Sequence, residues 1–515
     1  MEYIIFEKNN FKGSHIKRNY KTLLLRYFVI GFLLTILSFL CYCKIGNNLK
    51  KSNILKNQQI TFLLEEEIPD LDLIRQNPHL QTEFILNLLS EPSKIDSTLF
   101  KNNHNKIKQK IYSIIENKDK NKELYNILST IYGAFLADSM GSGAESKPKD
   151  KNNHLLIYNE EGRFKPGQIT DDSEMAMSQA YGIMDNGYYK ALNNHLIYYY
   201  YVLWYKSNPI DIGPVTKAAL QYLDLDQVNI TDEIIFSDKI KDKISVKNSA
   251  SLANGFIMRA SPFLTWFYML YKEYISGTLK TKSKENFFIL YNKIYNEISK
   301  DVQLTHPNRE NFVSASIFIF MGLCSMEHLS GKEILENTEI LLQNIHFRNQ
   351  ANEEENKIKN HFENTLKEFS KENFEKDFFF NNLEEQSGLY LHAFNLTLYY
   401  LYTFDSQKEK MDLKDIYNNI VYDICDFGGD TETNSAIVGM IMGPLIGMEN
   451  FDKKYFDIFL NYYSAERLIY TNVFMYFYAN YLLEMANYPA YIENYNKVNF
   501  NFMEMILNML NKEIS

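Results

Sequence analysis

The chain has 515 residues, of which 45% are hydrophobic and 23% are charged. This composition is ordinary for a globular protein, so the chain can bury a sizeable core without metals, and its four cysteines form no disulfide framework. The formal net charge of -10 argues against a broad nucleic-acid-binding surface, and we expect no nucleic acid among its partners.

An uncharged apolar run near the N-terminus, Tyr27 to Cys43, is at the short end of the length that spans a bilayer. A cleaved signal peptide and a buried core helix are the alternatives, but the run is long for a signal peptide and no clear cleavage site follows it. We therefore predict a basic tail over residues 1–21 and a single membrane-spanning helix over residues 22–46. The excess of Lys and Arg before the run favours placing the rest of the chain on the non-cytoplasmic side of the membrane.

The remainder divides into a polar segment over residues 47–121, predicted as a stalk or adaptor, and a large body over residues 122–515. Helical periodicity recurs along the body, and we find no series of alternating strands, so the predicted fold class is all-α. The predicted helices cover residues 124–140, 175–184, 194–205, 249–270, 287–298, 312–326, 389–402, 433–446 and 455–485. Charged stretches near 223–247 and 349–376 are predicted as insertions or solvated helices.

Two of these helices carry small residues at four-residue intervals. The first has Gly133, Ala137 and Gly141, and the second has glycines from 439 to 447 after a serine at 435. Residues four apart lie on one face of a helix, so each stripe lets another backbone approach closely. We predict that both are close-packed central helices.

Two oxygen-rich clusters come directly before apolar-periodic segments. The first is Thr-Asp-Asp-Ser-Glu at residues 170–174, and the second is Asp-Thr-Glu-Thr at residues 430–433. Each alone is explained by helix capping. Together they offer carboxylates and hydroxyls without thiols or imidazoles, a donor set that suits Mg, Mn or Ca. We therefore predict one metal site built from two helix starts.

Four separated motifs resemble the ADP-ribosylglycohydrolase family, which includes dinitrogenase reductase-activating glycohydrolase and the ADP-ribosyl-acceptor hydrolases. The first is residues 133–145, an opening helix and a loop that ends in Glu; the second is Thr-Asp-Asp-Ser at residues 170–173. The third is Ser-Leu-Ala-Asn-Gly-Phe-Ile-Met-Arg at residues 251–259, followed by Thr-His at 305–306, and the fourth is Gly-Gly-Asp-Thr-Glu-Thr at residues 428–433. The resemblance covers about residues 122–470.

The resemblance implies an all-α orthogonal helical bundle with two Mg or Mn ions in a central cleft. By motif match, it implies metal ligands at Thr170, Asp171, Asp172, Asp430, Glu432 and Thr433. It implies catalytic roles for Glu145, as a general acid or base, and for Asp171. It implies an ADP-ribose site lined by Ser251, Asn254, Gly255, Met258, His306, Gly428 and Gly429. Without the resemblance, His306 is better explained as a satisfied structural histidine.

The expected activity is metal-dependent hydrolysis of the C1'' glycosidic bond of ADP-ribose linked to a protein side chain or a small molecule. The expected partners are an ADP-ribosylated protein or ADP-ribose derivative and, through the N-terminal helix, a membrane. Arginine, serine, poly(ADP-ribose) and O-acetyl-ADP-ribose linkages all stay open. Glu432 stands where the family usually has Asp, so a catalytically impaired ADP-ribose-binding or structural member is the alternative, and an unrelated helical phosphate- or nucleotide-binding protein is a third.

Overall fold

The structure is a computed structural model that describes residues 97–487 apart from 187–190, 224–235, 346–352 and 381–386. The predicted basic tail, the predicted membrane helix at 22–46 and most of the predicted stalk therefore lie outside the described residues. Within the described ranges every regular element is a helix, and the only β-type pairing is two isolated bridges, which confirms the all-α prediction for this part of the chain. None of the helices in these ranges has the length and apolar character needed to cross a membrane.

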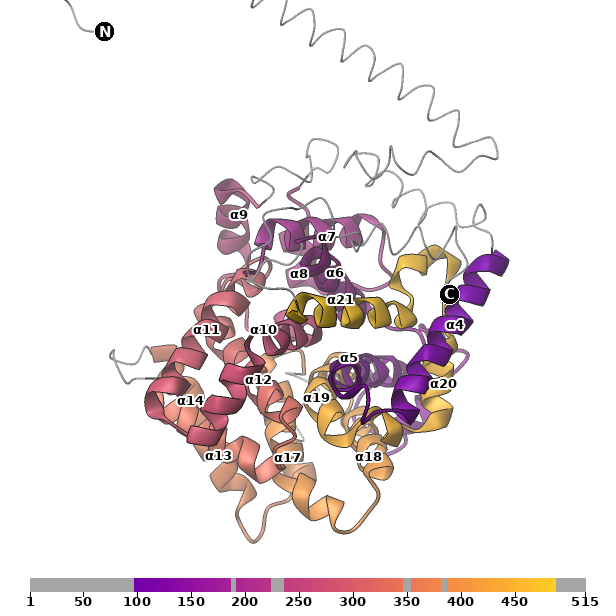
Figure 1. The fold of residues 1–515 in the computed structure, drawn as a ribbon. Helices are drawn as coiled ribbons and strands as arrows, with labels where there is room; N and C mark the ends of the chain where they lie inside the picture. The colour runs from indigo at the N-terminus through magenta and orange to yellow at the C-terminus, as the bar shows by residue number, and fades with distance from the viewer. Residues whose placement is uncertain (1–96, 187–190, 224–235, 346–352, 381–386, 488–515) are drawn as a thin grey trace, which may run out of the picture. The chain divides into compact units, whose positions relative to one another are not determined.

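The centre of the fold is the pair α5 (Lys122–Gly141) and α19 (Thr431–Ile446), which pack along their lengths (Figure 1). A Cβ atom added at Gly133 would lie 2.6 Å from the carbonyl oxygen of Gly439, and one added at Gly443 would lie 2.4 Å from that of Ser129. Any side chain at these positions would therefore push the two backbones apart. The predicted role of the two small-residue stripes, close packing of central helices, is confirmed.

The other helices surround this pair, with α10 to α14 gathered on one side of it and α6 to α9 above it in the view of Figure 1. Their bounds are α4 Ser97–Glu116, α6 Asp171–Asp185, α7 Asn194–Lys206, α8 Pro214–Leu220, α9 Asp238–Asn248, α10 Ser261–Thr281, α11 Lys284–Val302, α12 Arg309–Met326, α13 Gly331–Asn344, α14 Glu353–Phe369, α15 Lys376–Phe379, α17 Tyr390–Lys408, α18 Leu413–Phe427, α20 Lys453–Asn461 and α21 Met475–Asn487. Short 3₁₀ helices connect them at Ser142–Ala144 (η2), Asn153–Leu156 (η3), Asn254–Phe256 (η5), Met448–Asn450 (η6), Ala465–Tyr470 (η7) and Asn472–Phe474 (η8).

Two predicted helices are corrected by the structure. The helix expected over 249–270 begins only at Ser261, because Pro262 occupies its first turn, where a missing N–H does no harm, and the residues before it form a loop around η5. The helix expected over 455–485 is interrupted between α20 and α21. There Asn472 donates to the carbonyls of Gly167 and Phe459, and these tertiary bonds outweigh the weak local preference for helix.

Helix α4 falls within the segment predicted as a stalk. Its Phe100, Ile107 and Ile111 are buried, and the Phe100 ring lies 5.3 Å from that of Tyr463. The described end of this segment thus packs on the body, while the division of the chain into tail, anchor, stalk and catalytic domain stays a prediction.

Candidate active site

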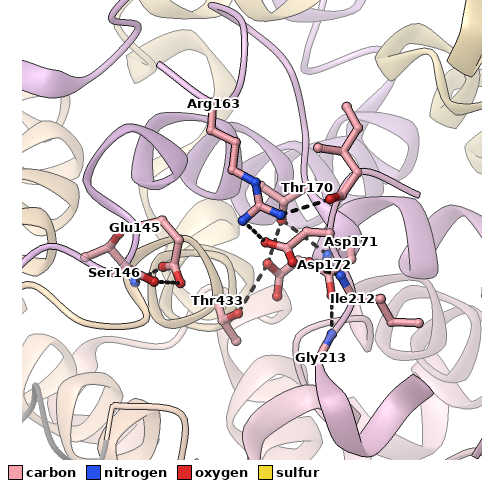
Figure 2. Close-up of polar contacts among 12 residues, drawn as sticks. Glu145, Ser146, Arg163, Thr170, Asp171, Asp172, Ile212, Gly213 and Thr433 are labelled. Atoms are coloured by element: carbon pink, nitrogen blue, oxygen red, sulfur yellow. Dashed lines mark hydrogen bonds and ion pairs between the residues drawn. The ribbon is translucent and has the colours of Figure 1, made fainter. Parts of the chain in front are cut away.

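The N-termini of α6 and α19 meet, and this contact joins the two oxygen-rich clusters. The Thr433 hydroxyl donates to Asp172 Oδ2 over 3.3 Å, although 261 positions separate the two residues in the sequence. Thr170, the N-cap of α6, lies 2.8 Å from the same carboxylate oxygen, and Asp171 and Asp172 form the first turn (Figure 2). Both helix starts therefore direct their polar first turns at one point, as the sequence predicts.

A carboxylate that the sequence analysis did not assign to the site, Asp138 on α5, supports this arrangement. It is fully buried and accepts hydrogen bonds from the backbone and side chains of Thr170 and Ser173. The Thr170 hydroxyl is 2.8 Å from both Asp138 Oδ1 and Asp172 Oδ2. One hydroxyl proton cannot serve two carboxylates, so this spot needs a further proton or a cation.

Three more carboxylates gather at the start of α19. Glu145, Asp430 and Glu432 each place one oxygen within 4.8 Å of the others, close enough to hold one metal ion. Glu145 Oε2 accepts from the backbone N–H of Thr431 at 3.1 Å, and, after burial, the nearby Glu145 carboxyl contributes to raising the pKa of Glu432. Glu145, expected from the sequence as an acid or base, is thus also a neighbour of the predicted metal ligands.

The loop that carries Glu145 is fixed to the Gly-Gly turn before α19. Ser146 N–H donates to Gly429 O and Gly429 N–H donates to Lys147 O, each at 2.9 Å. Gly428 has φ of +78°, and a Cβ there would lie 2.4 Å from Lys147 O, so only glycine allows this approach. The Gly428 N–H donates to Cys425 O, so both glycine amides are already used within the protein and are not directed at a phosphate.

The charge of the cluster is unbalanced. Burial, reinforced by neighbouring carboxylates, raises the pKa of Asp171, Asp172 and Glu432 well above the usual range, and burial with Glu145 nearby raises the pKa of Asp430 to about 7. Among the described residues, the buried atoms Asp172 Oδ1 and Glu432 Oε2 have no hydrogen-bond partner. Oxygen donors that lack partners and repel each other are what a hard divalent cation would satisfy, so the residues present fit the predicted metal.

The predicted ADP-ribose residues of the 251–258 segment border this cluster. Asn254 Nδ2 donates to Asp430 Oδ2 at 2.7 Å, which ties the segment directly to a predicted ligand. A Cβ at Gly255 would lie 3.1 Å from the His306 ring, and Met258 is buried. Ser251 is partly exposed, and its carbonyl accepts from an asparagine side chain on α12.

His306 is fully buried, and its Nδ1 lies 2.8 Å from the Thr305 hydroxyl. Burial, with the Arg259 guanidinium second, lowers its pKa well below the usual range, so the ring is neutral at pH 7. Arg259 itself is buried, paired with Asp301 at 3.2 Å, and donates to the Gly255 carbonyl. This pair fixes the backbone between Asn254 and His306.

Glu174 belongs to the first cluster in sequence but not in space. Its carboxylate accepts from Arg467 Nε at 2.9 Å and from Trp204 Nε1 at 2.8 Å, both buried. It therefore anchors the segment after α20 to α6. The sequence offers no signal for this pairing, because the partners are 293 positions apart.

Comparison with known proteins gives a consistent result. The family model for ADP-ribosylglycohydrolase matches residues 119–477. A protein of Acanthamoeba polyphaga mimivirus, whose name describes it as an ADP-ribosyl glycohydrolase, is 29% identical over 356 residues, which cover 66% of this chain and 92% of that protein. A solved structure titled as an ADP-ribosylglycohydrolase-related protein complex aligns with 71% of this chain and 99% of its own, at 15% identity and a TM-score of 0.44.

Proposed function

The chain belongs to the ADP-ribosylglycohydrolase family, and from this membership we propose that it is a metal-dependent hydrolase of the C1'' glycosidic bond in ADP-ribose linked to a protein side chain or a small molecule. The observation that carries the proposal is the meeting of two helix starts, in which Thr433 contacts Asp172 while Glu145, Asp430 and Glu432 converge within 4.8 Å. Such a set of buried oxygen donors has little structural value without a cation.

We assign Thr170, Asp171, Asp172 and Thr433 to one side of the metal centre and Asp430 and Glu432 to the other. The unpartnered oxygens of Asp172 and Glu432 support this assignment. When bound, Mg or Mn ions would supply Lewis acidity to ribose oxygens or to water. We propose two ions, the number that the resemblance to the family implies.

The chain's own residues supply positioning and proton transfer. Glu145 is only partly buried and lies at the mouth of the cluster, with Oε2 held by Thr431 N–H and Oε1 by the Ser146 hydroxyl. A carboxyl in this place can take a proton from an attacking water or deliver one to the leaving oxygen. Asn254 orients Asp430, and neutral His306 with the 251–258 segment would hold ADP-ribose beside them.

The direct test uses the full chain in mild detergent with peptides that carry ADP-ribose on serine or on arginine. Release of free ADP-ribose is followed with Mg, with Mn and with EDTA. We expect metal-dependent release that falls by about 100-fold or more in Asp171→Asn, because a metal ligand is weakened. Asp119→Asn, an exposed position between α4 and α5, is the matched control and should keep full activity. The same assay is run with poly(ADP-ribose) and O-acetyl-ADP-ribose, and absence of release from all four substrates with either metal would refute the proposed hydrolase.

One observation favours the alternative, an ADP-ribose-binding member impaired in catalysis. Glu432 is one methylene longer than the usual Asp, and one of its carboxyl oxygens lies within 4.8 Å of an oxygen of Glu145, the candidate acid or base. Mg demands near-octahedral geometry and tolerates a displaced ligand poorly. ADP-ribose binding without turnover, measured on the same preparation, would favour this candidate.

A further inference from the structure

A salt bridge with an exposed guanidinium lies beside the Asp171 end of the cluster. Arg163 donates through Nη1 to Asp211 Oδ2 at 2.8 Å and through Nη2 to the Ile210 carbonyl at 2.9 Å (Figure 2). The Ile212 N–H donates to the other Asp211 oxygen at 2.9 Å. Asp211 is thus held on both oxygens, and a guanidinium from the same chain occupies its outer face.

This salt bridge is close to the reacting centre. The next backbone N–H, that of Gly213, donates to Asp171 Oδ2 at 3.4 Å. Apart from burial, Asp211 is the largest contributor to the raised pKa of Asp171, and it also acts on Asp430. A cation bound to Asp211 therefore changes the electric field in which the bond to ADP-ribose would break.

The salt bridge also lies where a modified protein would approach. The side chain of Arg163 is 53% exposed and that of Asp211 is 28% exposed, whereas Asp172, Asp430 and Glu432 are largely inside. If the buried carboxylates hold the ribose, the side chain of the ADP-ribosylated protein reaches the site from solvent. It then passes the exposed edge of the site formed by Arg163, Ile210 and Asp211, which we call the rim. Ile210, 47% exposed, adds an apolar surface to the same rim.

We propose that Arg163 is a specificity-determining residue, which by occupying Asp211 makes the site prefer ADP-ribose linked through an uncharged oxygen, as on serine, over ADP-ribose linked to a guanidinium. This inference rests on the proposed function and deepens it. An arginine-linked substrate would bring a second guanidinium to a carboxylate that is already paired, and the two like charges repel. A hydroxyl-linked substrate brings no charge and needs no such carboxylate.

The preference is graded. An exposed ion pair is held only modestly, so a substrate guanidinium can displace Arg163 at a cost corresponding to about two- to fivefold in rate. The loop position of Arg163 and Asp211 agrees with a role in selectivity, because neither residue belongs to the helix pair that holds the candidate metal ligands.

The test compares the full-length wild type with Arg163→Ala, the double variant Arg163→Ala/Asp211→Asn and Lys165→Ala. Lys165 is the matched control: it is exposed on the same loop, and its ammonium donates to the carbonyl of Glu160. The first measurement is the ratio of release rates from serine-linked and arginine-linked peptides. The wild-type ratio should favour serine, fall by about two- to fivefold in Arg163→Ala and stay unchanged in Lys165→Ala.

The second measurement does not depend on turnover. Ligand-observed NMR in the presence of Mg follows binding of Nα-acetyl-argininamide, a single guanidinium on a neutral body. The probe should bind Arg163→Ala more strongly than it binds the wild type or the double variant. Equal probe signals for Arg163→Ala and wild type, or an unchanged rate ratio in active enzyme, would overturn the inference. If no variant releases ADP-ribose from either peptide, the proposed function fails for these two linkages, and the NMR result still decides whether Asp211 is a guanidinium site blocked by Arg163.

Discussion

Replacement of Gly133 by alanine tests whether the contact between α5 and α19 is as tight as the structure indicates. The added methyl group would lie 2.6 Å from Gly439 O and 2.7 Å from Gly443 Cα. Both obstacles are backbone atoms of a buried helix, so neither can rotate away, and α19 must shift. We expect the variant to unfold at a lower temperature than the wild type.

The size of the effect follows from two opposing contributions. Alanine in a helix interior is favoured over glycine by about 1 kcal/mol, while forcing a methyl group into a packed core costs about 1–3 kcal/mol. Because rigid backbone blocks the methyl group, the packing cost should be at the upper end, about 3 kcal/mol. The net loss in unfolding free energy is then about 2 kcal/mol. For a chain of this size that corresponds to a fall in melting temperature of about 2–4 °C.

Gly277→Ala on α10 is the matched control. It is the same substitution inside a helix, but a Cβ there meets nothing within 4 Å. It should raise the unfolding free energy by up to about 1 kcal/mol. Thermal unfolding of both variants, followed by circular dichroism with EDTA present, isolates the packing contribution. If Gly133→Ala proves as stable as Gly277→Ala, the close packing of α5 on α19 is refuted.

Three further predictions concern the site and the N-terminus. Glu432→Asp should raise activity several-fold if the extra methylene displaces a metal ligand, and an unchanged rate with Mg and with Mn would show that the site accommodates Glu. The pKa of Asp430 is raised to about 7, so between about pH 4 and pH 7 the metal-free folded chain holds a proton that the unfolded chain has lost. The stability of the metal-free protein should therefore fall as the pH rises from about 4 to about 7. The gain in melting temperature on replacing EDTA by Mg should be larger at about pH 8 than at about pH 5.5. Deletion of residues 1–46 should release the chain from sedimenting membranes, and a deletion variant that still sediments would contradict the predicted anchor.

The parts of the fold that the sequence predicts are those that depend on neighbours in the chain. Periodicity placed α5, α11 and α12 within a few residues of their bounds, and cap residues placed the starts of α6 and α19. The four-residue spacing of glycines predicted which helices form the centre. Each of these signals is local, because a helix face repeats within one or two turns.

The parts that the sequence did not predict depend on partners distant in the chain. An acidic residue inside an apolar helix, such as Asp138, indicates a buried polar contact. Its partners, Thr170 and Ser173, are set by the tertiary fold, so the sequence does not identify them. The partnership of Arg163 with Asp211 joins two loops that carry no motif. Loops have no periodicity from which a contact can be read, so tertiary placement alone reveals such pairs.

Local sequence signals predict one part of the site, the helix starts, whereas contacts between distant loops form the other part. The predicted metal ligands belong to helix starts fixed by the α5–α19 packing, so a change in that packing should alter stability and metal affinity together. Arg163 and Asp211 belong to loops before α6 and α8, so loss of the Arg163 charge should alter the choice of substrate without lowering the metal-dependent stabilisation. Measuring metal-induced stabilisation in both Gly133→Ala and Arg163→Ala tests this separation: a loss in the first with none in the second supports it, and equal losses would mean that rim and metal centre form one cooperative unit.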